Sequence, residues 1–377
     1  MMYELIATTT FGLEAVCRRE IEQLGYKVKS TENGKVTYLG DERAIVKSNL
    51  WLRTADRVLL KVAMFKALTF DQLFDQTKAI EWSKYISKQG KFIVNGKSVK
   101  STLFHVSTCQ KMVKKAIVDN LKDAYKVTWL DETAEEYSIQ VSILKDMATI
   151  TIDTSGIGLH KRGYRIRTVE APMKETLAAS LVLLSYWNKD RVLYDVFCGS
   201  GTIPIEAAMI GRNIAPGLAR DFASKHWNWI SKDIWKEETR LAYQAMDNDA
   251  EIKIYASDIS AKDIEAAKEN AEEAGVEDCI EFRQADFKEI EYENNYGIVI
   301  SNPPYGERLD TEHIVRGMYI AMGNIFRRLD TWSAYFITSY EEFERVYGKK
   351  ADRNRVLYNG RIKARYYQYY GPRPPKE

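Results

Sequence analysis

The sequence has few of the features that mark secreted, membrane or metal-binding proteins. Its 377 residues include only four cysteines, and no two of them form a CxxC pair. Such isolated cysteines indicate reduced thiols in a cytoplasmic chain rather than a disulfide or zinc framework. The four histidines also lack the spacing of metal ligands, so no metal site is expected.

Targeting and membrane segments are missing as well. The first residues, MMYELIATTTFGLEAVCRRE, reach acidic residues at once and contain no apolar core of a signal peptide. No uncharged apolar run approaches the roughly 20 residues that a membrane-spanning helix needs. The sequence therefore predicts a protein with no membrane partner.

Strong net charge is a third missing feature. The formal charge is only +2, so any nucleic acid would have to be bound by local basic patches. A hydrophobic share of 45% and a charged share of 29% are ordinary for a globular protein. The length is enough for two or three domains.

The N-terminal part of the chain predicts two small α+β units. Residues 1–65 begin with a strand, YELIATTT, and continue with a helix at 12–24, a hairpin turning at Asn33-Gly34 and a helix at 41–56. Residues 66–158 contain two helical patterns, 70–86 and 106–125, followed by a hairpin turning at Lys145-Asp146.

Residues 159–377 follow a different pattern, in which strands and helices alternate. Apolar strands such as RVLYDVF, IKIYASD and GIVISN are separated by amphipathic helices, and a hairpin around Asn359-Gly360 closes the chain. This alternation predicts a doubly wound, mostly parallel α/β sheet with an antiparallel edge. A Trp-rich and basic stretch at about 212–250 interrupts the alternation. It is expected to lie beside a substrate mouth, and the alternative is a structural pair of helices.

A basic segment precedes this α/β region. GIGLHKRGYRIRT, residues 156–168, carries Lys161, Arg162 and Arg165 with Tyr164 between them. One interpretation is a basic linker. The other is a stretch that contacts the phosphates of a nucleic acid.

Polar residues follow the predicted strands of the α/β region in order. Asp195 ends the first strand and is followed by Gly199 and Gly201, Asp258 ends the second, and Asp286 ends the third. Ligands of doubly wound sheets bind at these carboxyl ends, and glycines let a ligand approach the backbone there. The acids suit an amino group, ribose hydroxyls and an adenine amino group.

The fourth strand ends in Asn302-Pro303-Pro304-Tyr305. Two prolines end the strand and remove two N–H donors, so an amide side chain, rigid carbonyls and an aromatic ring remain. This combination is suited to holding a flat ring that bears an amine. The alternative is a strand end with a cis-proline turn.

These motifs resemble a known family. DVFCGSGT (195–202), ASDIS (256–260), QADF (284–287) and NPPYGERL (302–309) are similar to class I S-adenosylmethionine-dependent methyltransferases that act on an exocyclic amino nitrogen. The N-terminal half, LHKRGYR (159–165) and APMKETLAASLV (171–182) resemble THUMP-domain RNA guanine-N2 methyltransferases of the 23S rRNA type. The resemblance covers essentially the whole chain.

The resemblance implies three domains: a ferredoxin-like unit at 1–65, an RNA-binding THUMP domain at 66–158 and a methyltransferase domain at 159–377. It implies S-adenosyl-L-methionine as the cofactor and S-adenosyl-L-homocysteine as its product. The partner would be 23S rRNA or a partly assembled large ribosomal subunit, with tRNA as a weaker candidate. The predicted catalytic residues are Asn302, Pro303, Pro304 and Tyr305, and the predicted cofactor-binding residues are Asp195, Cys198, Gly199, Ser200, Gly201, Thr202, Asp258, Ile259, Asp286, Phe287 and Asn302.

Other functions stay open at this point. NPPY alone cannot separate guanine N2 from adenine N6, so an adenine-N6 methylase of DNA or RNA is the second hypothesis. A tRNA guanine-N2 enzyme is the third, and an RNA-binding assembly factor is the non-enzymatic one. Cysteine-based methyl transfer and a serine hydrolase are disfavoured, because the sequence has no Pro-Cys pair and no G-x-S-x-G motif.

Overall fold

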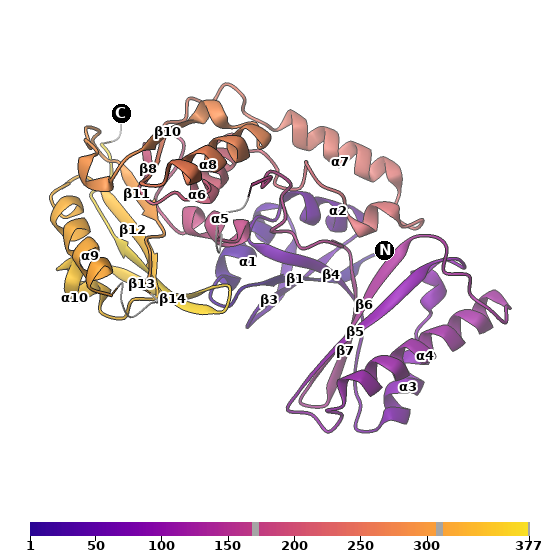
Figure 1. Cartoon of the computed structure of the whole chain (residues 1–377). Coiled ribbons are helices and arrows are strands. Elements are labelled where there is room, and N and C mark those ends of the chain that lie inside the picture. Colours follow the sequence, from indigo (N-terminus) through magenta and orange to yellow (C-terminus); the bar gives the residue numbers. More distant parts are fainter. Residues whose placement is uncertain (168–172, 307–311, 376–377) are drawn as a thin grey trace. The chain divides into compact units, whose positions relative to one another are not determined.

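The computed structural model describes residues 1–167, 173–306 and 312–375, which fall into two compact units (Figure 1). The first unit comprises Met1–Thr9, Arg18–Leu159 and Asp221–Leu241. The second comprises Thr10–Cys17, His160–Arg220 and Ala242–Glu377. No helix in the described ranges has the length and apolar character needed to cross a membrane.

One seven-stranded sheet runs through the first unit in the order β2-β3-β1-β4-β7-β6-β5. The twelve-residue strand β4 pairs antiparallel with β1 on one side and with β7 on the other. The two N-terminal units predicted from the sequence therefore share a single sheet. The strands are β1 (Tyr3–Thr9), β2 (Lys27–Glu32), β3 (Lys35–Gly40), β4 (Ala55–Lys66), β5 (Lys91–Val99), β6 (Glu136–Leu144) and β7 (Met147–Asp153).

The helices near the N-terminal sheet match the predicted ones in position, but the pattern predicted at 70–86 is an α-helix only as far as Lys78. Asp41 caps the second helix by accepting a hydrogen bond from the Ala44 N–H, at 3.0 Å. The predicted helix at 41–56 is too long, because it ends at Trp51 and the chain then enters β4. The helices are α1 (Glu14–Gln23), α2 (Glu42–Trp51), α3 (Phe70–Lys78) and α4 (Val106–Tyr125), and α4 packs on β5.

The Trp-rich stretch differs from expectation. Its central part, Asp221–Leu241, clusters with the first unit and not with the predicted methyltransferase domain. Trp227 is buried there, stacks on Tyr137 with ring centroids 5.0 Å apart and donates to the Glu136 carbonyl. The position of the stretch beside a substrate mouth stays a prediction. Asp221–Leu241 also contains the start of helix α7 (Lys232–Gln244).

The second unit is the predicted doubly wound sheet. Its strand order is β10-β9-β8-β11-β12-β14-β13, in which the first five strands are parallel and the last two form an antiparallel hairpin. This confirms the predicted fold class. The strands are β8 (Leu193–Asp195), β9 (Ile254–Asp258), β10 (Ile280–Gln284), β11 (Ile298–Ser301), β12 (Ser333–Thr338), β13 (Arg353–Asn359) and β14 (Ile362–Tyr369).

Both faces of this sheet are covered. Ile298 and Ile300 pack with α5 (Glu175–Leu183), α6 (Thr202–Gly211) and α8 (Ala261–Glu273). Val299, between them in sequence, packs with α9 (Glu312–Phe326) and α10 (Phe343–Tyr347). Successive side chains of a strand point to opposite faces, which is why a continuous apolar run fills both layers. Because helices cover both faces of the sheet, a ligand site is expected at the ends of its strands.

Candidate methyltransferase site

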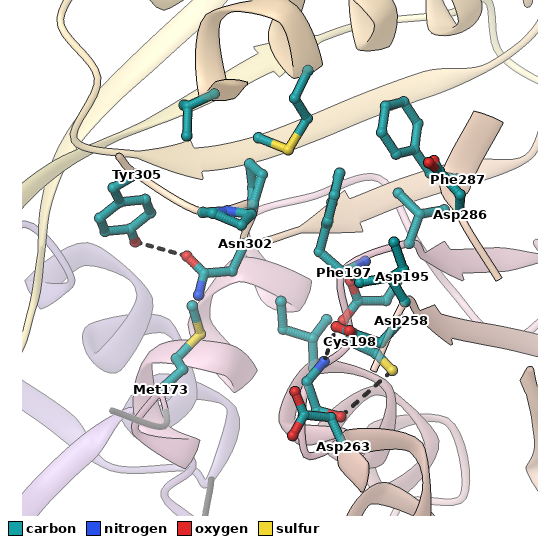
Figure 2. A pocket seen from close by; sticks show the side chains of 18 of the residues that line it. Met173, Asp195, Phe197, Cys198, Asp258, Asp263, Asp286, Phe287, Asn302 and Tyr305 are labelled. Atoms are coloured by element: carbon teal, nitrogen blue, oxygen red, sulfur yellow. Dashed lines mark hydrogen bonds between the residues drawn. The ribbon is translucent and has the colours of Figure 1, made fainter. Parts of the chain in front are cut away.

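A cavity of about 1310 Å³ lies at the carboxyl ends of the central strands. The chain runs from β8 outward to β9 and β10, and then returns to β11 on the other side of β8. Such a reversal of strand order opens a crevice at the strand ends. Figure 2 shows residues that follow β8, β9, β10 and β11 around this one cavity.

The loop after β8 makes a tight turn that contains two glycines. Gly199 and Gly201 have φ angles of +52° and +81°, which residues with a side chain rarely adopt. A Cβ on Gly201 would also lie 3.0 Å from the Ala267 Cβ in α8. Both glycines are therefore required for the turn that leads into α6 at Thr202. Burial raises the pKa of the Cys198 thiol, so this cysteine is a small buried group rather than a nucleophile.

Asp195 is the buried acid of the cavity. Its Oδ1 accepts from Ser301 Oγ at 2.7 Å and from the Phe197 N–H at 3.3 Å. Its Oδ2 has no hydrogen-bond partner among the described residues. Burial is the main cause that raises the pKa of this carboxyl to about 7. A buried carboxylate oxygen of this kind is suited to a cationic or amino ligand.

The next two acids shape the loops that they follow. Asp258 accepts the N–H groups of Gly199 and Ser260, each at 3.0 Å, and so ties the end of β9 to the glycine loop. Asp286 accepts the Lys288 N–H at 3.0 Å. Phe287 is buried against Phe197, with ring centroids 5.1 Å apart. Carboxylates beside an apolar wall fit the ribose and adenine of S-adenosylmethionine.

The opposite wall carries the Asn-Pro-Pro-Tyr motif. Tyr305 donates its hydroxyl to Asn302 Oδ1 at 2.7 Å, as the dashed line in Figure 2 shows. Tyr319 of α9 donates to the Pro304 carbonyl, also at 2.7 Å. All described peptide bonds are trans, so the alternative of a cis-proline turn is wrong. Glu307, Arg308 and Leu309, which end the motif quoted from the sequence, lie outside the described residues, as do Ala171 and Pro172.

The predicted RNA-contacting set divides into exposed and internal residues. Lys161 is exposed. Arg162 is buried and forms an ion pair with Glu206, which also accepts from the hydroxyl of the buried Tyr164. Burial therefore contradicts the predicted RNA contact for Arg162 and Tyr164.

Arg165 is also turned inward, and its side chain is only 11% exposed. Its guanidinium donates to Glu175, to the Met173 carbonyl and to the hydroxyls of Ser200 and Thr202. The predicted contact of Arg165 with RNA is corrected accordingly: the side chain braces the glycine loop.

Several lining residues were not predicted. α9 contributes residues such as His313 and Met318, and the turn of the β13–β14 hairpin contributes Asn359 and Ile362. In the sequence Asn359 signals only a turn before Gly360. The hairpin itself is local, but the approach of Asn359 to Tyr305, 54 positions earlier, depends on the pairing of β14 with β12, which no local pattern shows.

The doubly wound sheet, glycine loop and acidic strand ends are typical of class I methyltransferases, whose cofactor is S-adenosylmethionine. Family models match the chain in three segments: an RlmL ferredoxin-like domain at residues 4–59, a THUMP domain at 67–153 and an RMKL-like methyltransferase domain at 162–368. The chain therefore belongs to the RMKL-like methyltransferase family.

Relatives of known sequence or structure cover the full length. "Putative RNA methyltransferase YpsC" of Bacillus subtilis (strain 168) is 52% identical over 99% of this chain and 97% of its own. A Listeria monocytogenes structure called a "predicted N6-adenine-specific DNA methylase" has 51% identity and a TM-score of 0.95, with 99% and 97% coverage. "SMU.472, a putative methyltransferase complexed with SAH" has 42% identity, a TM-score of 0.95 and 99% coverage of both chains.

Proposed function

We propose that this methyltransferase transfers a methyl group from S-adenosylmethionine to the exocyclic N2 of a guanine in RNA, with 23S rRNA as the substrate. The proposal rests on the positions of Asn302 and Tyr305 across one cavity from Asp195 Oδ2, an oxygen to which no described residue donates. The structure complexed with SAH, 42% identical, supports the cofactor.

The proposed chemistry needs no strong base before attack. The cofactor supplies a methyl group that is already activated on a sulfonium. An exocyclic amine is a poor nucleophile, because its lone pair is delocalised into the ring, and it gains positive charge as it attacks. The new nitrogen–carbon bond would replace the methyl–sulfur bond, with S-adenosylhomocysteine as the leaving group, and the methylated nitrogen would then lose one proton to water. Asn302 Oδ1 and the Pro303 carbonyl can accept its N–H bonds and stabilise that charge. They also fix the position of the amine, while the Tyr305 ring stacks on the base.

Two findings favour RNA as the substrate. A THUMP domain matches residues 67–153, and the Bacillus subtilis relative is named as an RNA methyltransferase.

The target amine of a paired base lies inside a stem, so the base has to be extruded or already unpaired. A cavity of about 1310 Å³ has room for a base beside the cofactor.

Adenine N6 is the second candidate. The Listeria monocytogenes neighbour carries the description of an N6-adenine-specific DNA methylase, and an Asn-Pro-Pro-Tyr motif can hold either exocyclic amine. The two candidates differ in the base that receives the methyl group.

The test is methyl transfer from labelled S-adenosylmethionine to deproteinised 23S rRNA, tRNA and DNA from cells that lack this gene. Digestion to nucleosides and mass spectrometry identify the product. N2-methylguanosine in 23S rRNA, lost with Asn302→Ala, is the expected result. N2-methylguanosine in tRNA would support guanine N2 as the target but would overturn 23S rRNA as the substrate. N6-methyladenine in DNA would overturn both.

A further inference from the structure

Asn359 connects the edge hairpin to the Asn-Pro-Pro-Tyr motif. Its Nδ2 donates to the Tyr305 hydroxyl at 3.3 Å, and that hydroxyl donates to Asn302 Oδ1 at 2.7 Å. All three residues line the same cavity. A chain of two hydrogen bonds therefore leads from the hairpin turn to the oxygen that would receive the acceptor amine.

The hairpin holds Asn359 in a defined place. Asn359 is the last residue of β13 and pairs with Ile362, across a turn in which Gly360 has a φ of +62°. β14 pairs with β12 along five residues, and the buried Tyr366 donates its hydroxyl to the Leu181 carbonyl. The amide is thus fixed at its backbone, and only its side-chain torsions are left to change.

This arrangement creates a competition at Asn302. The Tyr305 hydroxyl already uses one of the two lone pairs of Oδ1, the atom that an acceptor amine would approach. When an N–H of the base takes that lone pair, the Tyr305 proton requires another acceptor, because a hydroxyl that loses its hydrogen bond costs free energy. The amide of Asn359 carries a carbonyl oxygen beside the nitrogen that now faces Tyr305, and rotation of the amide exchanges the two.

We propose that Asn359 is a positioning residue that accepts the Tyr305 hydroxyl when the acceptor base binds and thereby frees Asn302 Oδ1. The inference rests on the proposed function and adds a residue from the edge hairpin to its acceptor side. Asn359 acts through Tyr305 and not on the cofactor. No covalent bond changes in this step, since only hydrogen-bond partners are exchanged.

The test compares Asn359→Ala with Asn359→Asp at saturating S-adenosylmethionine. The substrate is deproteinised total RNA from cells lacking the gene, and the readout is N2-methylguanosine by mass spectrometry. Alanine removes the acceptor and is expected to lower kcat/KM for RNA by about 5- to 30-fold, the usual effect of one hydrogen bond. Aspartate keeps an acceptor and is expected to retain most of the activity.

A double-mutant cycle separates positioning from simple support. Tyr305→Phe removes the hydroxyl but keeps the ring, so adding Asn359→Ala to it should cause no further loss. The dissociation constant of S-adenosylmethionine should stay within about twofold of wild type in all these variants, because the relay does not reach the acids of the cofactor side. Asn354→Ala is the matched control, since Asn354 lies in the same strand and bonds only to an exposed Arg365 in the hydrogen bonds described.

Three results would overturn the inference. They are equal losses with Asn359→Ala and Asn359→Asp, a full additional loss in the Tyr305→Phe background, or weakened cofactor binding in Asn359→Ala. Failure of the proposed function looks different, because wild type then methylates another nucleoside. In that case the same variants are compared on that product, and the same criteria decide.

Discussion

The two sides of the cavity hold their polar groups in different ways. On the proposed cofactor side, Asp195, Asp258 and Asp286 each accept at least one backbone N–H group, although Asp195 also accepts from Ser301 Oγ. The loops that follow the strands therefore help to set the positions of all three acids. On the acceptor side, Asn302, Tyr305 and Asn359 bond to one another through side chains. Backbone bonds preorganise a site, whereas side-chain bonds can be exchanged when a ligand arrives. We infer that the cofactor site is built in advance and that the acceptor site is completed by the base.

Asn302→Ala should have the largest effect and should separate the two sides most clearly. It removes an acceptor that we propose stabilises charge on the attacking nitrogen, and loss of one such group lowers rates by about 100- to 1000-fold. Single-turnover methyl transfer measures this loss, and isothermal titration calorimetry measures cofactor binding. A cofactor affinity that falls as far as the rate would contradict the division into two sides.

Asp195 predicts a dependence of cofactor affinity on pH. Its pKa is raised to about 7, so the free protein holds a proton there below that pH. A cationic ligand favours the carboxylate, and the affinity should therefore rise with pH up to about 7 and then level off. Below that pH the dissociation constant should change by up to about tenfold per pH unit.

Asp195→Asn is the control for the predicted pH dependence of cofactor affinity. Asp195→Asn cannot ionise, so its affinity should be flat over the same pH range. At pH 8 it should bind S-adenosylmethionine about 10- to 100-fold more weakly than wild type, since a charged hydrogen bond is lost. A profile in the variant that still rises with pH would assign the titration to another group.

Arg165→Ala should weaken cofactor binding by about tenfold, which corresponds to ~1.4 kcal/mol. The guanidinium holds Ser200 and Thr202 of the glycine loop, so the change loosens that loop without touching the acceptor side. Arg167→Ala is the matched control, because Arg167 is exposed and pairs with Glu269. Equal binding by the two variants would show that the loop needs no brace.

Lys161→Ala should have the smallest effect. Among the four residues predicted to contact RNA, Lys161 is the exposed one that the structure leaves on the surface. Removal of one phosphate contact should weaken RNA binding at low salt and reduce the salt slope by about one. Filter binding over a salt series measures both. An unchanged slope would remove Lys161 from the RNA interface.

The sequence predicts most of the fold and the order of the strand ends. Alternating apolar and amphipathic segments fix the doubly wound sheet, and the acids at the strand ends follow from that topology. Strand β4 was not predicted, because its apolar residues directly follow a helical pattern. No local signal shows that it joins two halves of one sheet. Domain boundaries and the roles of the site residues remain predictions.

Long-range contacts account for the remaining differences. The sequence suggests that Arg162 is a basic surface residue. In the structure it is buried and forms an ion pair with Glu206, 44 positions later. Asn359 reads as a turn residue, yet strand pairing brings it to Tyr305. Charge and turn propensity are local signals, whereas burial and partner choice depend on the packed structure. The positions of the strand ends were therefore easier to predict than the partners of residues in the segments between them.

The most direct test of the two-sided site is a titration of methyl transfer with S-adenosylmethionine in Asp195→Asn and Asn302→Ala, with RNA held at saturation. We expect excess cofactor to restore the maximal rate of Asp195→Asn to near that of wild type, because that variant loses binding. Asn302→Ala should stay slow at every cofactor concentration, because it loses stabilisation of the reacting nitrogen. If excess cofactor rescues both variants, or neither, the cofactor and acceptor sides are not separate.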